Sequence, residues 1–185
     1  MVTSVTLEIG AKIETERDKD DLIAVYLDAY ADRLDDPFLS PDRHWERLQG
    51  YASAGGYGIV EARIDGKMIG YALGYTLPAS ANWWRGLTAP VDPSFLVEDG
   101  SRTFALTYMM VRTGFRRKGY AKRMHDALLS SRTEQRATLL VHPANMAARN
   151  AYYSWGWYKV GDLQPFSDAP VYEALLKPLT AIPGG

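Results

Sequence analysis

"RTGFRRKGYAKRM", residues 112–124, places six cationic side chains around two glycines in a chain of 185 residues whose net charge is −1. The apolar run from Thr103 to Val111 before it predicts a buried strand, and the apolar positions from Tyr120 onward recur at helical spacing. The cationic cluster therefore lies at a junction between a strand and a helix. Unpaired backbone N–H groups and the positive end of the helix dipole meet at such a junction, so this turn is predicted to bind a phosphate group.

Other interpretations of this basic segment are weaker. A run of Lys and Arg most often forms a solvated helix face. A P-loop for nucleoside triphosphates has Ser or Thr after Gly-Lys to hold magnesium, whereas Lys118-Gly119 is followed here by Tyr120, which excludes that motif. A nucleic-acid interface needs cations and aromatics spread along a face, and only Phe115 and Tyr120 accompany this cluster.

The composition is that of a folded, globular protein. Apolar residues make up 46% of the chain and charged residues 23%, and the length suits one domain, residues 1–185. The 21 Lys and Arg balance the 22 Asp and Glu, so no global field draws the chain onto DNA or an anionic bilayer. We therefore expect no nucleic-acid or membrane partner.

Several kinds of chemistry are excluded or disfavoured by residue usage. The chain has no cysteine, which excludes disulfides, thiolate metal ligands and a cysteine nucleophile. Its three histidines are scattered without ligand spacing, so no metal site is expected. The first 21 residues lack the pattern of a signal peptide, and no apolar stretch is long enough to span a bilayer, so we expect a cytoplasmic protein.

Hydrophobic periodicity predicts an α+β (mixed α/β) fold. A strand at residues 5–9 precedes one helix from about 20 to 34 and another that starts near Pro41, and Asp65-Gly66 is the typical turn of a two-residue hairpin. The full predicted order is strand, two helices, three strands, helix, strand, helix and two strands. The strand, helix, strand passage in mid-chain implies a parallel pair with a right-handed crossover.

Two motifs resemble a known family. Residues Met109 to Ala121 are similar to the strand and pyrophosphate-loop signature of the GNAT acyl-CoA N-acetyltransferases, Gln/Arg-x-x-Gly-x-Gly/Ala. A second motif of that family, Asn-x-x-Ala-x-x-x-Tyr-x-x-x-Gly-Phe, matches at every interval, with Trp in place of Phe, in Asn145, Ala148, Tyr152, Gly156 and Trp157. The chain is therefore identified as a suspected member of the GNAT superfamily.

The resemblance implies a fold and a cofactor. It implies a central mixed sheet of about seven strands flanked by four helices, in which the parallel fourth and fifth strands splay. Acetyl-CoA lies in that gap in the family, where its pantetheine arm pairs with the fourth strand like an added strand. The implied cofactor-binding residues are Met109, Met110, Val111, Arg116, Arg117, Lys118, Gly119, Tyr120, Ala121, Asn145, Ala148 and Tyr152.

Tyr152 is the residue that we expect to take part in catalysis. A phenol with a pKa of about 10 can protonate a leaving thiolate whose thiol has a pKa of about 8.5. The alternative is an aromatic residue on the core face of a helix, shared with Ala148 and Trp155.

The amine also needs a base, because a lysine-like amine has a pKa of about 10.4 and is protonated at pH 7. Several relatives place a Glu on the fourth strand, where this chain has no carboxylate. The candidates are His142 and Glu61, with Glu98 or Asp99 acting through water, and we leave the choice open.

The residues expected to contact the acceptor amine lie in loops. Phe38, Trp83, Trp84 and Glu98 lie in loops expected to flank the acceptor cleft, and together they suit a cation with an apolar body. The alternative is that the acidic loops are solvated and the tryptophans pack beneath them. A small-molecule amine is favoured, with a protein N-terminus or lysine, or a non-catalytic acyl-CoA-binding module, as alternatives. Related proteins often dimerise, which leaves a homodimer open.

Overall fold

A computed structural model describes residues 5–10, 12–165 and 167–179 of the chain. The chain divides into two compact units, Met1–Tyr75 with Leu106–Arg132, and Thr76–Ala105 with Thr133–Gly185. We call these the first and the second unit. Strand β4 (Thr103–Val111) begins in the second unit and ends in the first.

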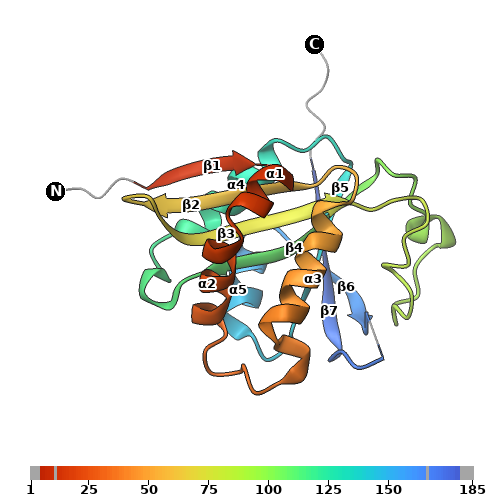
Figure 1. The fold of residues 1–185 in the computed structure, drawn as a ribbon. Helices are drawn as coiled ribbons and strands as arrows, with labels where there is room; N and C mark the ends of the chain where they lie inside the picture. The colour runs from red at the N-terminus through yellow and green to blue at the C-terminus, as the bar shows by residue number, and fades with distance from the viewer. Residues whose placement is uncertain (1–4, 11, 166, 180–185) are drawn as a thin grey trace, which may run out of the picture. The chain divides into compact units, whose positions relative to one another are not determined.

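The remaining elements of the first unit combine strands and helices in one α+β arrangement (Figure 1). In chain order they are β1 (Thr6–Gly10), α1 (Lys12–Arg17), α2 (Lys19–Ala29), the short 3₁₀ helix η1 (Pro37–Leu39), α3 (Pro41–Ala52), β2 (Gly58–Ile64), β3 (Lys67–Thr76), η3 (Thr113–Phe115) and α4 (Tyr120–Ser130).

The remaining elements of the second unit are mainly strands, with one α-helix. They are η2 (Pro93–Leu96), β5 (Arg136–Val141), α5 (Met146–Ser154), β6 (Tyr158–Leu163) and β7 (Tyr172–Pro178).

The strand order is β1-β2-β3-β4-β5-β7-β6, which confirms the predicted mixed sheet of seven strands with a parallel β4–β5 pair. The helices differ from the prediction, because the described residues form five α-helices and not four. The extra helix is α1, which ends where the backbone leaves helical geometry at Asp18, the N-cap residue of α2. The prediction for α2 was also too long, since it ends at Ala29 and not near Leu34.

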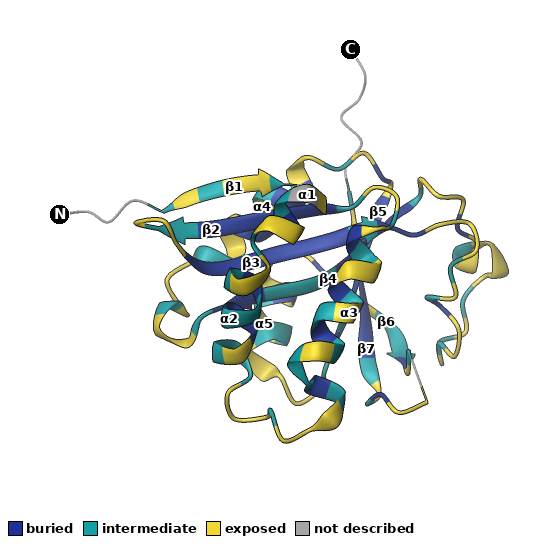
Figure 2. Ribbon diagram, viewed as in Figure 1, coloured by how far each residue is buried: buried dark blue, intermediate teal, exposed yellow. Residues whose placement is uncertain are grey.

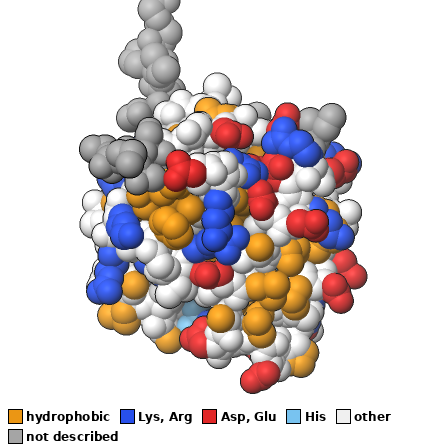
Figure 3. Space-filling view, turned by 60° about the vertical axis from the view of Figure 1, so that its left-hand side comes forward, with side chains coloured by type: hydrophobic (Ala, Val, Ile, Leu, Met, Phe, Trp, Pro, Cys, Tyr) orange, Lys and Arg blue, Asp and Glu red, His pale blue; other side chains and the backbone are white. Residues whose placement is uncertain are grey.

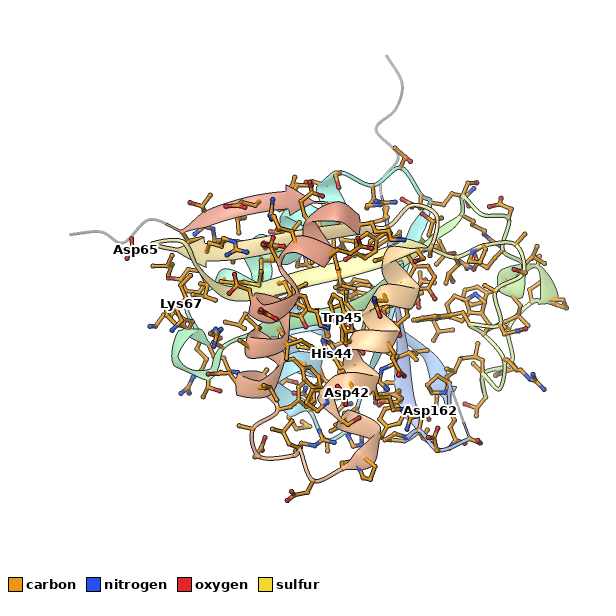
Figure 4. The ribbon with its side chains drawn as sticks, viewed as in Figure 1. Asp42, His44, Trp45, Asp65, Lys67 and Asp162 are labelled. Atoms are coloured by element: carbon orange, nitrogen blue, oxygen red, sulfur yellow. The ribbon has the colours of Figure 1, made fainter. Side chains whose placement is uncertain are left out.

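The β2–β3 hairpin has the predicted turn. Ile64 pairs with Lys67, and both turn residues, Asp65 and Gly66, have positive φ angles of 50° and 78°. Two positive φ values are the geometry of the type I′ turn, which matches the right-handed twist of the two strands. Asp65 and Lys67 mark this tip in Figure 4.

The two faces of the β2–β3 hairpin carry different side chains. One face packs large residues against α2 and α3, which lie across it in Figure 1, and Figure 2 shows both strands as largely buried. The core members are Leu22, Val25, Tyr26, Leu48, Ile59, Met68, Tyr71, Leu73 and Met110. The opposite face carries small residues, and a Cβ at Gly70 would lie 2.5 Å from the carbonyl oxygen of Met110 and 3.1 Å from the Met124 side chain. Helix α4 can therefore pack closely on this face, which fixes the position of its N-terminus.

In the second unit a short parallel ladder joins β4 and β5. Only Thr103 to Ala105 pair with Arg136 to Thr138, although β4 continues to Val111 and β5 to Val141. The ladder therefore ends well before either strand does. Strand β7 pairs antiparallel with both β5 and β6.

Candidate active site

The turn before α4 presents main-chain donors to solvent. Gly119 is the N-cap residue of α4 in the left-handed region, with φ 80°, and no side chain caps the helix. The first hydrogen bond of the helix runs from Arg123 N to Gly119 O at 3.1 Å, so the N–H groups of Tyr120 and Ala121 precede the intrahelical ladder. Arg117 also has a positive φ, 59°, and a Cβ at Gly119 would meet no atom within 4 Å. An open, positively polarised turn of this kind fits an anion such as a diphosphate.

The cations of this turn divide into two kinds. Arg116 supports the turn, since its Nε donates to Val111 O at 3.2 Å and its Nη2 donates to Ala29 O at 3.0 Å. Lys118 folds back onto Gly114 O at 3.1 Å and lies over the Phe115 ring. Arg117 is exposed, and no hydrogen bond or ion pair ties it to another described residue. Arg117 is therefore the cation best placed to reach a ligand.

The end of β4 leads directly into this turn. Met110 and Val111 are buried, and Met109 is half-buried. Arg112 then ties the strand to β3, because its backbone N donates to Ile69 O at 2.8 Å and its Nε to Met68 O at 2.9 Å. The residue that follows segment 109–111 is thus bonded to β3, which holds the end of β4 in place within the first unit.

Helix α5 of the second unit is fixed at both ends by the residues of the second motif. Asn145 is its N-cap residue, whose Oδ1 accepts from Ala148 N at 3.2 Å, and the amide NH₂ of Asn145 remains as a donor. At the other end Gly156 has φ 85°, and Trp157 N donates to Tyr152 O at 3.1 Å, a Schellman motif. The Tyr152 ring is buried and meets Trp155 and Trp157 edge to face.

A sequence profile of the acetyltransferase (GNAT) family matches residues 20–157, which is well over half of the chain. The chain belongs to the acetyltransferase (GNAT) family. Acetyl-CoA is the acyl donor of this family. No curated protein sequence matches the chain.

Solved structures of low sequence identity share the fold of this acetyltransferase. The ribosomal-protein-S18-alanine N-acetyltransferase from Escherichia coli is 16% identical, with a TM-score of 0.64, over 96% of this chain and 95% of that chain. The PaiA N-acetyltransferase from Thermoplasma acidophilum, solved with coenzyme A, is 12% identical, with a TM-score of 0.59, over 95% and 99%. An aminoglycoside N-acetyltransferase, AAC(6')-Iy, also solved with coenzyme A, is 14% identical, with a TM-score of 0.61, over 91% and 97%.

The first two of the candidate bases, His142 and Glu61, are both engaged within the protein. The Nδ1 atom of His142 accepts from Ala144 N at 3.1 Å, so a neutral ring carries its proton on Nε2 and has no free lone pair. Glu61 is buried, and its Oε2 accepts from Arg63 Nη2 at 2.9 Å. Burial raises the pKa of Glu61 to about 7, although the hydrogen bond from Arg63 lowers it.

Three of the predicted acceptor-binding residues lie in the long loop of the second unit. Glu98 Oε1 accepts from Trp84 Nε1 at 2.8 Å, from Thr103 Oγ1 at 2.9 Å and from Arg136 Nη2 at 3.0 Å. Trp84 is buried, and Trp83 packs against the same cluster. These contacts anchor the loop on the sheet. The tryptophans pack as the alternative interpretation expected, whereas Glu98 is buried and not solvated.

Phe38, the fourth predicted acceptor residue, lies in η1 of the first unit beside two arginines. The guanidinium carbons of Arg43 and Arg47 lie 4.7 and 4.9 Å from its ring centroid. Arg47 also donates from Nε to the Tyr108 hydroxyl at 3.0 Å. Sequence reasoning missed Arg47 and Tyr108, because they are 61 positions apart in the chain and no local pattern links them.

Basic and acidic side chains are interspersed on the face shown in Figure 3, and neither kind forms a continuous patch there. No helix among the described residues has the length and hydrophobicity needed to cross a membrane. The described residues also contain no group of three or more His, Asp or Glu side chains placed to hold a metal ion.

Proposed function

We propose that this protein is an acetyl-CoA-dependent N-acetyltransferase that acetylates a primary amine of a small molecule by direct attack in a ternary complex. The observation that carries the proposal is the uncapped N-terminus of α4, where Arg117 and Gly119 both have positive φ. The matched family region runs through both units, so we further propose that they form one catalytic domain.

Acetyl-CoA supplies an acetyl group that is activated as a thioester. The main-chain N–H groups of Tyr120 and Ala121 would bind its diphosphate, with Arg117 adding charge. Arg116 and Lys118 would hold the turn in shape and contribute to the local positive potential. Backbone groups of residues 109–111 would pair with the pantetheine arm, and the amide of Asn145 would donate a further hydrogen bond.

Tyr152 would hold the proton that the sulfur of coenzyme A takes when it leaves. Its ring is fixed by Trp155 and Trp157, which orients the hydroxyl without a flexible element. A positioned proton donor of this kind contributes about 10²- to 10⁴-fold to a rate.

The proton of the amine would pass to water before attack. His142, Glu98 and Asp99 each accept a hydrogen bond within the protein. Glu61 is buried against Arg63, so we assign the proton to water. Deprotonation by solvent then makes the rate follow the fraction of neutral amine.

The second candidate acceptor is a protein N-terminus, because the E. coli neighbour is by its title a ribosomal-protein-S18-alanine N-acetyltransferase. Two assays separate the candidates. Steady release of coenzyme A with an amine of the panel supports a small acceptor and excludes a non-catalytic module, whereas labelled acetyl groups that appear only on macromolecules of a lysate support a protein acceptor. We also propose that the protein is cytoplasmic and that it forms a homodimer.

A further inference from the structure

Arg47 is a half-buried cation without a carboxylate partner among the described residues. Its Nε donates to the Tyr108 hydroxyl at 3.0 Å, and its Nη2 donates to the carbonyl oxygen of Phe38 at 3.1 Å. Its Nη1 is buried and has no hydrogen-bond acceptor. All partners of this guanidinium are neutral, so its positive charge is not compensated inside the first unit.

Aromatic rings surround this charge. Phe38 lies beneath the guanidinium, and Tyr108 meets the rings of His44 and Tyr51 at 4.7 and 5.8 Å between centroids. His44, labelled in Figure 4, is buried and adds no charge, because desolvation lowers its pKa to about 3. The other arginine of α3, Arg43, also lies over the Phe38 ring, 4.7 Å from its centroid.

An unpaired charge in such a place is costly, because a desolvated ion is unfavourable unless an opposite charge and hydrogen bonds accompany it. A bound anion would remove that cost. The Tyr108 hydroxyl accepts from Arg47, and its own proton has no acceptor among the described residues, so it is free to donate to the same anion. Both side chains are half-buried and not fully enclosed, although Nη1 of Arg47 is itself buried.

The position of this pair relates it to the reaction. Tyr108 directly precedes residues 109–111 in β4, which under the proposed function pair with the acyl donor. Phe38, whose ring and carbonyl oxygen both contact Arg47, was predicted from the sequence to contact the acceptor.

We propose that Arg47 and Tyr108 select an acceptor that carries a carboxylate in addition to its amine, an inference that rests on the proposed function. One guanidinium and one hydroxyl match the single charge and two oxygens of a carboxylate.

The test compares acceptors that differ only in the carboxylate. Each α-amino acid of a panel is paired with its own carboxamide, and the ratio of kcat/KM for acid over amide is measured for the wild type and for Arg47→Met. Dividing the two ratios cancels the intrinsic reactivity of the amines. We expect the ratio to fall about 10- to 100-fold in Arg47→Met, the range for one lost charge-assisted hydrogen bond.

Two variants serve as controls. Arg43→Met removes the other guanidinium that contacts the Phe38 ring and is expected to change the ratio by less than about twofold. Arg47→Lys keeps the charge without the planar fork and is expected to retain part of the preference. Thermal melting of each variant reports whether it folds.

Isothermal titration separates this inference from the proposed function. The same acids and amides are titrated into protein saturated with coenzyme A, so the preference is measured without turnover. Tighter binding of acids that is lost in Arg47→Met supports the inference even if no amine is acetylated, an outcome that contradicts the proposed function alone. Equal affinity or turnover for acids and amides, or an equal loss of preference in Arg43→Met, would overturn the inference.

Discussion

The backbone N–H of Trp157 donates a 3.1 Å hydrogen bond to the carbonyl oxygen of Tyr152, and the two rings meet with centroids 5.9 Å apart. Gly156 makes this bond attainable, because its φ of 85° reverses the chain at the end of α5. The spacing of Tyr, Gly and Trp in the second motif therefore has a structural role in addition to any role in the reaction.

Tyr152→Phe removes only the hydroxyl and keeps the ring between Trp155 and Trp157. We expect kcat to fall roughly 100-fold or more, because the leaving sulfur loses its proton donor. The KM for acetyl-CoA and the melting temperature should hardly change. Steady-state kinetics with a thiol-release assay check this expectation, and an unchanged kcat would remove Tyr152 from the mechanism.

Gly156→Ala tests the structural role of the same motif. A side chain in the left-handed region is strained, so we expect the free energy of unfolding to fall by about 1–2 kcal/mol in urea denaturation. The added Cβ would also lie 3.1 Å from Lys177 Nζ, which donates to the carbonyl oxygen of Trp155 at 2.7 Å. The control is Gly50→Ala within α3, where nothing lies within 4 Å and the substitution should stabilise by about 0.5–1 kcal/mol. Equal effects of both variants would contradict the account.

Glu61→Gln tests the raised pKa of the buried carboxyl, about 7 against 4.5 in the unfolded chain. Below pH 4.5 both states are protonated. Between pH 4.5 and 7 the unfolded chain loses its proton while the folded protein keeps it, so stability falls as pH rises and the loss is complete above pH 7.

The wild type should therefore lose roughly 1–3 kcal/mol relative to Glu61→Gln between pH 4.5 and pH 8. Arg63 keeps Asp21 at 2.7 Å in the variant, so the ion cluster around it persists. Urea denaturation of both proteins across this range measures the difference. If the unfolding free energies of the two proteins changed in parallel with pH, Glu61 would have an ordinary pKa.

The pH dependence of kcat/KM tests the proposal that water deprotonates the amine. We expect log kcat/KM to rise with unit slope and to level off at the pKa of each amine, about 10.4 for a lysine-like acceptor. His142→Gln and Glu61→Gln should follow the same curve. A plateau near neutral pH that disappears in one of these variants would instead identify that residue as the base.

Local features of the fold were predictable because they depend on neighbours in the sequence. Asp65-Gly66 specified a two-residue turn, the apolar period specified a helix from Tyr120, and Asn145 was recognised as a helix N-cap residue. Helix α1 was missed, because its six residues are too few to show a helical period in the sequence.

Long-range pairing was not predictable from local pattern. Arg47 and Tyr108 are 61 positions apart, and nothing in either neighbourhood indicates that they meet. Glu98 was predicted to face the acceptor, but the sequence could not reveal that Trp84, Thr103 and Arg136 all donate to it. Loop residues of this kind are placed by the packing of the whole unit.

The proposed function requires the main-chain turn before α4 to bind the diphosphate of coenzyme A. Isothermal titration of coenzyme A into Gly119→Ala tests it, with Gly66→Ala as the control, because both glycines have nearly equal φ values, 80° and 78°, and open space around them. Both variants should lose similar stability, about 1 kcal/mol. The account predicts that Gly119→Ala binds coenzyme A roughly tenfold more weakly while Gly66→Ala binds it like the wild type. Unchanged affinity in Gly119→Ala, or an equal loss in both variants, would contradict it.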